Sequence, residues 1–556
     1  MDKNLYEKTT VKVQKKSGFD KSHQNLFTGR VGTLIPILVD ELIPNTSVDL
    51  EAAISAQLPP LASDTFMRCS LKYASFFVPT RLLVSGYERW LTGYDKNTDQ
   101  PTDTTKRIQM PILKFNFTED SSTASFKQLS PGSLADYLGA KYSVNTLNAM
   151  KTAKAGSVQL SALPFLAYHR IYDDWFRNSL VQVPVFNDVS YDSGDYATYQ
   201  FKNSKFVSPS GITGNIVSGA DNKCILADGV RITDLRQANF DIDLFTSASP
   251  RAQNGAAAKV TLTNATGGNG SFTISALRSA NSMQQFLERN NIAGNRMVDY
   301  VRAQYGANLS DAVAQRPILL GSGQFDVYSK GVYQTANSAV SDIAANPFST
   351  SSGAKFGSAF AEGKDKLCKF TAQEPGYLMV IAWLSPHVTY ATGVAPHLFR
   401  YRKNDSQAEM ANPILQNVGN EPIPSAYIQD SYIKDGQDTE TFGFGDRYCT
   451  WKDKYDECHG ELRDGQTLQS FALQRSFIGN TFATTINSEF LKIPTNYLDQ
   501  VLSVSDYAAE FSYWCDTYFN YKVSMPLARY SIPTLQDPAA EHGEDITVRK
   551  SGTQLT

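Results

Sequence analysis

The sequence predicts a mainly β protein: a sandwich of antiparallel strands whose long inter-strand insertions contain several helices. Three observations predict this fold class. Strand patterns lie between about 34 and 79 and again from 376 to 523. Polar, turn-rich excursions separate them, and loops longer than about 15 residues are uncommon in a compact domain unless they carry function or meet a partner. A sandwich whose strands pair across long sequence separations has this distribution.

The first strand patterns come early in the chain. Residues 34–44 form a compact apolar run with prolines near both ends, which suits an edge strand. Residues 47–56 alternate roughly as a second strand, and residues 68–79 are the clearest strand of the chain. Residues 81–91 then resemble a short helix that stops at Gly93.

Residues 161–178 predict a dense aromatic helix. Pro164 suits the first turn of a helix, where its missing N–H costs nothing. Four aromatic side chains then recur at spacings of three and four on one face, which must be buried in the core or at an interface: Phe165, Tyr168, Tyr172 and Trp175. A core helix of any large domain would show the same pattern.

The second half of the chain predicts one further helical region and two strands. Residues 277–305 form an amphipathic pattern interrupted at Gly294, which indicates two helices in sequence. Strands follow at 376–385, a continuous apolar segment, and at 511–523, an aromatic-rich alternation; both suit the inner layers of a sandwich. Two tryptophans in these strands are further candidates for core or interface positions: Trp383 and Trp514.

The domain organisation is one domain with large excursions. The chain has 556 residues, and no shift in composition separates two domains. We expect a basic N-terminal arm at 1–21, mobile or inward-facing, a single domain at 22–535 and a C-terminal tail at 536–556. A short helix is expected at 133–138, within the first insertion. The insertions lie at about 94–160, 186–230, 251–276, 335–370 and 401–445.

Charge and cysteine content limit the partners and the compartment. The formal net charge is −3, which excludes a chain that is basic throughout but allows a local basic patch. The arm holds such a patch, and either nucleic-acid contact or an ordinary solvated terminus would explain it. Six cysteines are too sparse for a disulfide scaffold and are expected to be reduced and buried. With no signal-peptide core and no membrane-spanning apolar run, we expect a cytosol-like compartment and no membrane anchor.

Glycine motifs for phosphate or dinucleotide binding are near misses. The segment 357–364 resembles a phosphate loop, but one extra residue separates its glycines and Asp365 replaces the Ser or Thr that would bind magnesium. The Gly-x-Gly pairs at 321–323 and 443–445 lack a third glycine and are interpreted as turns. No cofactor is therefore expected.

Catalytic and metal-binding patterns are equally weak. Cys449, Cys458 and His459 could supply three metal ligands, but their spacing is not that of a zinc finger and a fourth ligand is missing. The acidic pairs could serve as acid and base only if they faced a cleft: Asp173 with Asp174, and Asp241 with Asp243. We therefore expect no catalytic residues and no metal site.

Several segments in a shared order resemble the major capsid protein of the Microviridae, the small bacteriophages with circular single-stranded DNA. The resemblance covers residues 19 to about 530, most of the chain. The matching segments are FDKSH (19–23), LIPILVDELIP (34–44), YASFFVP (73–79), residues 81–83, the helix at 161–178, FTSASP (245–250), residues 286–300, residues 315–317, EPGY (374–377) and FGDRY (444–448).

The resemblance implies an eight-stranded antiparallel jelly roll with long insertions, assembled into a T=1 icosahedral shell around the phage genome. It implies identical subunits meeting around fivefold, threefold and twofold axes, and a place in the virion after assembly in the host bacterial cytoplasm. Some members carry a variable insertion before the helix that starts here near Leu277. In this chain that region, 251–276, is short, whereas the excursion at 186–230 is long.

Contact with single-stranded DNA should use cations, which attract phosphates, and flat rings, on which bases stack. The cationic candidates lie in the arm: Lys12, Lys15, Lys16 and Lys21. Minor spike, pilot or scaffolding proteins and a host surface receptor are further partners of such a shell.

Two hypotheses for function follow. The first is a self-assembling coat protein without catalytic activity. The second is a β-sandwich carbohydrate-binding protein or glycan hydrolase whose tyrosine-rich loops form a sugar cleft.

Overall fold

The computed structural model describes most of the chain, with gaps in the long insertions. The described residues are 8–59, 61, 65–84, 87, 91, 110–117, 122–186, 226, 228–253, 255–256, 274–293, 296–330, 358–400, 411, 413, 419–429, 440–477, 485–502, 511–527 and 543–549. Most of the insertions predicted at 186–230, 251–276 and 401–445, the first part of that at 335–370, and most of the tail at 536–556 lie outside these residues.

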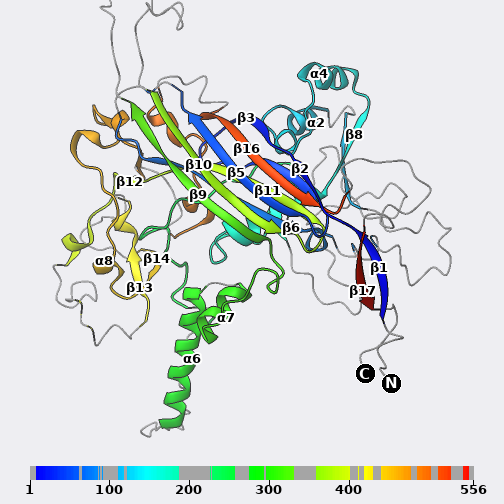
Figure 1. Cartoon of the computed structure of the whole chain (residues 1–556). Coiled ribbons are helices and arrows are strands. Elements are labelled where there is room, and N and C mark those ends of the chain that lie inside the picture. The colour runs from blue at the N-terminus through cyan, green and yellow to red at the C-terminus, as the bar shows by residue number, and fades with distance from the viewer. Residues whose placement is uncertain are drawn as a thin grey trace, which may run out of the picture.

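Nine strands form the central antiparallel sheet (Figure 1), in the order β2-β16-β5-β10-β9-β6-β11-β4, with β3 also paired to β16. Strands from the two ends of the chain therefore lie next to each other. Their bounds are β2 (Ser17–Asp20), β3 (His23–Gly29), β4 (Ile35–Leu42), β5 (Ser47–Gln57), β6 (Cys69–Pro79), β9 (Ile318–Lys330), β10 (Ser358–Thr371), β11 (Gly376–Pro386) and β16 (Tyr513–Met525).

Side chains of β6 reach past the neighbouring β9 and contact β10, which indicates that the sheet folds over on itself. The Tyr73 hydroxyl donates to the Asp365 carboxylate, and the Ser75 hydroxyl donates to the Leu367 carbonyl oxygen at 3.0 Å. The strands β9 and β10 join the two halves and pair only between 328–330 and 358–360. The predicted mainly β, antiparallel architecture is confirmed and is consistent with a β-sandwich. The eight-stranded jelly roll stays a prediction.

The strand patterns of the sequence agree with the position of each strand. β5 lies between β16 and β10 and alternates between buried and partly exposed residues, as a strand with one solvated face does. β6 and β11 are buried on almost every residue, because a helical layer covers the face that points away from the other half of the sheet. β4, the proline-flanked run, is an edge strand as predicted.

Three of the helical predictions are confirmed. The aromatic segment forms α5 (Leu163–Ile171), continued by one π-helical turn, η4 (Tyr172–Phe176). The amphipathic region forms two helices, α6 (Ile274–Ala293) and α7 (Met297–Tyr305). The short helix α3 (Leu134–Tyr137) has Ser133 as its N-cap and is followed by Gly139 at a φ of 108°. Of the predicted helix at 81–91, the structure describes only the 3₁₀ turn Thr80–Leu82 and a few residues beyond it.

The insertion at 94–160 contains elements that the sequence did not reveal: two helices, α2 (Ser122–Leu129) and α4 (Val144–Ala153), and a strand pair, β7 (Ile112–Asn116) with β8 (Ser157–Ser161). In α4 only Leu147 is fully buried. A helix that buries one residue has almost no apolar periodicity to detect.

The prediction of turns at the two Gly-x-Gly pairs is wrong. Gly321 and Gly323 lie inside β9, and the pair at 443–445 lies inside β14 (Thr441–Gly445). A Cβ atom on Gly321 would lie 2.2 Å from the Leu367 carbonyl oxygen. Glycine is therefore required there because another backbone approaches closely, and not because the chain turns.

Two hydrophobic cores support these elements. The larger one lies between and around the sheet halves and includes α5. The smaller one lies around Phe245, Tyr390 and Phe442, beside β12 (Thr389–Tyr390), β13 (Glu421–Pro424), β14, β15 (Gln474–Arg475), α8 (Cys449–Lys452) and α9 (Ser488–Leu491). None of the helices within the described residues has the length and apolarity needed to cross a membrane.

The two ends of the chain pair with each other. β1 (Lys8–Gln14) and β17 (Gly543–Arg549) form an antiparallel two-stranded ribbon beside the main sheet (Figure 1). Part of the N-terminal arm and part of the C-terminal tail thus form one element, which no local pattern in either segment indicates.

Candidate assembly and genome-contact surfaces

The aromatic face of α5 and η4 is buried, as its spacing predicts. Phe165, Tyr168 and Tyr172 are fully buried, and Trp175 is partly buried. The Tyr168 hydroxyl donates to the Leu34 carbonyl oxygen at 2.8 Å. It also accepts a hydrogen bond of 2.8 Å from the backbone N–H of Arg236. The predicted aromatic set therefore ties the helix to the start of β4 and to a loop more than 60 residues further along the chain.

Trp175 and Trp383 belong to the layer that covers β6 and β11. The Trp175 ring packs on Phe76 with 5.9 Å between centroids, and its indole N–H donates to the Pro317 carbonyl oxygen at 2.9 Å. Trp383 packs edge-to-face on Phe176 at 5.0 Å. Such contacts combine apolar burial with a satisfied indole donor.

Trp514 differs from the other predicted aromatics because it lies on the solvated face of β16. Its side chain is 38% exposed, and its indole N–H donates to Gln57 Oε1 at 3.2 Å. Tyr518, four residues further along the same face, is 53% exposed. Tyr518 is a candidate that the sequence reasoning missed, although the strict alternation of residues along β16 places it on the face of Trp514.

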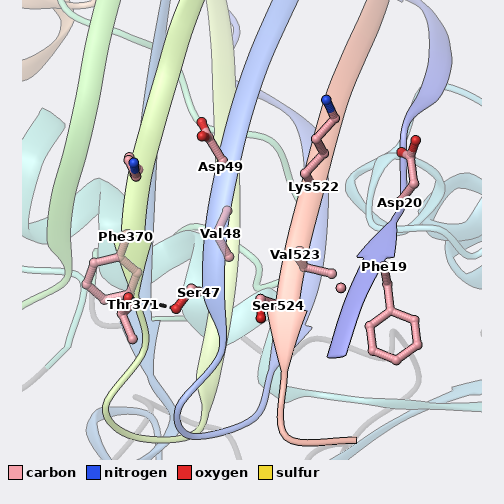
Figure 2. A pocket seen from close by; sticks show the side chains of 12 residues that line it. Phe19, Asp20, Ser47, Val48, Asp49, Phe370, Thr371, Lys522, Val523 and Ser524 are labelled. Atoms are coloured by element: carbon pink, nitrogen blue, oxygen red, sulfur yellow. Dashed lines mark hydrogen bonds between the residues drawn. The ribbon is translucent and has the colours of Figure 1, made fainter. Parts of the chain in front are cut away.

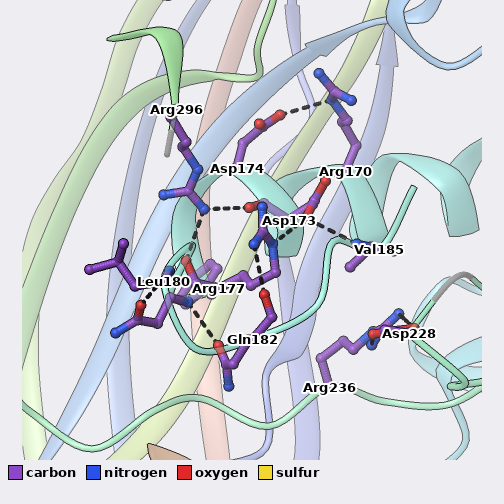
Figure 3. A network of polar contacts seen from close by, with 12 residues as sticks. Arg170, Asp173, Asp174, Arg177, Leu180, Gln182, Val185, Asp228, Arg236 and Arg296 are labelled. Atoms are coloured by element: carbon purple, nitrogen blue, oxygen red, sulfur yellow. Dashed lines mark hydrogen bonds and ion pairs between the residues drawn. The ribbon is translucent and has the colours of Figure 1, made fainter. Parts of the chain in front are cut away.

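An arginine and aspartate network closes the C-terminal end of the helix (Figure 3). Arg177 pairs with Asp173 at 2.5 Å, and Arg170 pairs with Asp174 at 2.8 Å. Burial raises the pKa of Asp174, and the charge of Arg170 opposes that rise. Arg296, between α6 and α7, donates to the carbonyl oxygens of Asp173 at 2.5 Å and Arg177 at 2.8 Å. The two carboxylates thus hold Arg170 and Arg177, and the backbone carbonyl oxygens of Asp173 and Arg177 anchor the α6–α7 unit.

A second buried network surrounds His169. Arg236 donates from Nε to His169 Nδ1 at 2.9 Å, so the proton of the imidazole is on Nε2, which donates to the Ile232 carbonyl oxygen at 2.8 Å. Arg236 also pairs with Asp228 and lies over the Tyr172 ring, 4.9 Å from its centroid. Burial, together with the charge of Arg236, lowers the pKa of His169 well below 6.5. The histidine is a neutral structural link.

The four candidate lysines of the arm lie in different surroundings. In the β1–β17 ladder Lys12 lies opposite Asp545. The Lys21 ammonium lies 2.7 Å from the Asp40 carboxylate, on which the Tyr521 hydroxyl also converges at 2.7 Å. Lys21 therefore joins the arm to the edge strand β4.

Among the candidate lysines whose side-chain exposure the structure describes, Lys15 and Lys16 are exposed and Lys21 is partly exposed. The Lys16 ammonium donates to the Ser47 hydroxyl at 3.2 Å, at the end of the solvated face that β5 shares with β16. Lys16 and the two exposed rings of β16 therefore belong to one side of the molecule.

A groove of about 560 Å³ lies at this end of the sheet (Figure 2), lined by β2, β5, β10 and β16. The strand register places four charged residues in one row across it, in the order Lys369, Asp49, Lys522 and Asp20. Their signs alternate, so the row has no surplus positive charge with which to hold a phosphate.

The remaining acidic pair, Asp241 and Asp243, organises a loop. Asp241 pairs with Lys72 of β6. Asp243 Oδ1 accepts hydrogen bonds from the backbone N–H groups of Phe245 at 2.9 Å and Thr246 at 2.7 Å. Both carboxylates are occupied by structural partners.

The cysteines described by the structure are free and buried. Burial raises the pKa of Cys368 and of Cys449 to about 12, so both thiols are protonated at neutral pH. The Cys449 thiol donates to Glu421 Oε1 at 3.4 Å, whereas the Cys458 thiol donates to the Leu462 carbonyl oxygen at 3.3 Å. In the described parts of the chain no three His, Cys, Asp or Glu side chains gather as a metal site would require.

Comparisons with known proteins identify a family and several relatives that resemble this chain. The profile of a protein family described as "Capsid protein (F protein)" matches residues 8–535. The chain is 24% identical to capsid protein VP1 of Chlamydia phage 1, over 96% of this chain and 98% of that protein. It is 24% identical to capsid protein VP1 of Bdellovibrio phage phiMH2K, over 93% and 95% of the two chains. Capsid protein VP1 of Spiroplasma virus 4 is 22% identical, over 92% and 94%.

The resemblance inferred from the sequence is thereby confirmed. Both the family profile and these relatives cover nearly the whole chain, so the match concerns the entire fold with its insertions. The family favours a structural role over the alternative of a carbohydrate-binding protein or glycan hydrolase. This chain belongs to the capsid protein (F protein) family of the Microviridae.

Proposed function

We propose that this chain is a major capsid protein that assembles into a T=1 icosahedral shell around a circular single-stranded DNA genome, and that it acts without catalysis. The observation that carries the proposal is the match to the capsid family over residues 8–535. As a capsid protein it resides in the virion, and we place its assembly in the host bacterial cytoplasm.

Exposed apolar side chains support self-assembly. Large hydrophobic residues lie on the surface far from one another in the fold, including Leu26, Phe66, Val183, Ile242 and Leu398. A subunit of a closed shell has to meet identical neighbours through several different patches. Exposed apolar patches are typical of such contact surfaces.

The proposed fold is an eight-stranded antiparallel jelly roll. Its support is the strand order: β3, β16, β5 and β10 follow one another in one half of the sheet, and β9, β6, β11 and β4 in the other. The contacts of Tyr73 and Ser75 with β10 agree with the two halves facing each other.

The proposed genome contact uses the solvated face of β16 and β5 together with the arm. Lys15 and Lys16 would neutralise phosphates, and Trp514 and Tyr518 would stack with bases, each stack contributing roughly 1–3 kcal/mol. Strand geometry separates the two rings by about 13 Å, so they would hold two bases of one extended strand. Minor spike, pilot or scaffolding proteins and a host receptor are proposed as further partners.

Self-assembly is tested by purifying the full chain, with its companion phage proteins if they are needed, and examining it by sedimentation and negative-stain imaging. Shells or their ring-like intermediates are expected. A chain that stays monomeric under all these conditions, or that turns over a glycan, would overturn the proposal.

Genome contact is tested separately. Removal of residues 1–21 and the double substitution of Trp514 and Tyr518 by Ser should each lower the DNA content of assembled particles. Raising the salt concentration should cost more DNA in the chain that keeps the arm but lacks the rings, because the arm holds phosphates by ion pairs whereas rings bind bases without them. Equal DNA content in all particles would remove this surface from the proposal and leave the assembly proposal intact.

A further inference from the structure

The helix α6 extends away from the sheets (Figure 1), and its best-defined contacts with the described part of the body lie in its C-terminal half. Near that end Asn291 is buried and donates to the Arg251 carbonyl oxygen at 2.9 Å. Leu287 lies against Gly255, and the Phe286 ring packs on Tyr300 of α7 at 6.4 Å. These contacts seat the helix on the rest of the subunit.

The N-terminal half of α6 exposes apolar side chains instead. Ile274 is 69% exposed, Leu277 is 49% exposed and Met283 is 52% exposed. An isolated helix shorter than about 12–15 residues is marginal in water, and Ser and Asn, frequent in this half, are weak helix formers. The helix therefore gains stability if this half meets a partner.

Two of these exposed residues, Leu277 and Met283, continue the face that is buried further along. At 100° per residue, Leu277, Ala280 and Met283 fall on the same side of the helix as Leu287 and Asn291. We call Leu277, Ala280 and Met283 the open stripe. Its steps of three residues, continued by a step of four to Leu287, are those by which helices pack side by side, and the small Ala280 at its centre permits close approach.

The charge of this half is compatible with an identical partner. Between 274 and 287 the helix carries one charged residue, Arg278, which lies on the side opposite the open stripe. Two or three copies of the helix can therefore lie side by side without facing like charges. Closed assemblies of identical subunits are built from such self-complementary or cyclic contacts.

The base of the helix is fixed. Arg296, which follows α6, holds the carbonyl oxygens of Asp173 and Arg177 at the end of the buried aromatic helix (Figure 3). A helix anchored in this way presents its open stripe in a defined direction, which lowers the entropy that a contact with another subunit has to overcome.

We propose that α6 is a homotypic assembly contact, in which the open stripe of one subunit packs against the open stripe of a second copy. The proposal rests on the self-assembly proposed above and assigns one of its contacts. It accounts for an exposed apolar helix that would otherwise lower the solubility of the subunit.

Crosslinking in assembled particles tests the contact directly. Ala280→Cys is assembled as the full chain and treated with a short thiol-to-thiol crosslinker. Covalent dimers are expected in at least tenfold excess over those of a matched variant, Ser282→Cys, on the opposite side of the helix. The unsubstituted chain is the blank, and the five described native cysteines are buried.

Charge substitution gives a second readout. Leu277→Glu with Met283→Glu should leave the melting temperature of the free subunit unchanged, because both side chains are exposed there, and should lower the yield of shells at least tenfold. Ser282→Glu should assemble normally.

The outcomes separate this contact from the proposed function. Shells of Ala280→Cys that give no dimers above the Ser282→Cys level would refute the homotypic contact while self-assembly stands. Normal assembly of the double Glu variant would refute it too. A native chain that never assembles would instead refute the proposed function.

Discussion

Replacing Tyr168 by Phe should destabilise the subunit although it removes a single oxygen atom. The Tyr168 hydroxyl is completely buried, donates to the Leu34 carbonyl oxygen and accepts from the Arg236 N–H, both at 2.8 Å. The substitution takes this partner from two buried backbone groups at once. Each group left without a hydrogen bond costs about 1–3 kcal/mol, so for the two groups we expect a loss of about 2–6 kcal/mol in the free energy of unfolding.

The loss of stability is measurable as a shift in melting temperature. With an unfolding entropy of about 2.1 cal/mol/K per residue, a chain of 556 residues that melts as one unit would melt about 2–5 °C lower, and a smaller cooperative unit would show a larger shift. The assay is thermal unfolding of the unassembled subunit, followed by near-UV circular dichroism. The control is Tyr518→Phe, because that ring is exposed on β16. Equal melting temperatures for Tyr168→Phe and the native chain would refute the hydrogen-bond reasoning.

Three further substitutions test other buried contacts of the subunit. Trp175→Ala should lower the unfolding free energy by about 3–5 kcal/mol, the range for a large aromatic removed from a packed site, and denaturant titration measures it. His169→Gln should flatten the acid side of the stability curve: the folded imidazole stays neutral while the unfolded one takes up a proton below pH 6.5, so the native chain should lose about 2 kcal/mol between neutral pH and pH 5. Gly321→Ala should cost about 1–3 kcal/mol, because its Cβ would collide with a backbone carbonyl.

Two of these substitutions have a control in the same chain. His397→Gln changes an exposed histidine and should leave the pH dependence of stability as it is. Gly18→Ala adds a Cβ where no atom lies within 4 Å and should melt like the native chain. An unchanged melting temperature for Trp175→Ala would mean that the aromatic helix is peripheral. A full acid-side slope in His169→Gln would mean that other groups set the acid sensitivity.

Local patterns were sufficient for the strands and helices whose burial is regular. The alternation along 47–57 and 513–525 and the aromatic spacing from 165 to 175 predicted real elements, because one-sided burial imposes a period of two on a strand and of about 3.6 on a helix. The helix at 144–153 escaped detection because it buries only Leu147 in full, and the helix at 122–129 because two of its buried residues, Ser125 and Gln128, are polar and give no apolar period.

The sequence by itself determined the family, the mainly β class, the place of the aromatic helix and the basic character of the arm. Only the tertiary structure decided which of these side chains are free to meet a partner. Lys21 is held by Asp40, Lys12 lies opposite Asp545 at the other end of the chain, and Trp514 faces solvent while Trp175 does not. The physical reason is that propensity and periodicity depend on neighbours in the chain, whereas ion pairing and exposure depend on segments that folding brings from hundreds of residues away.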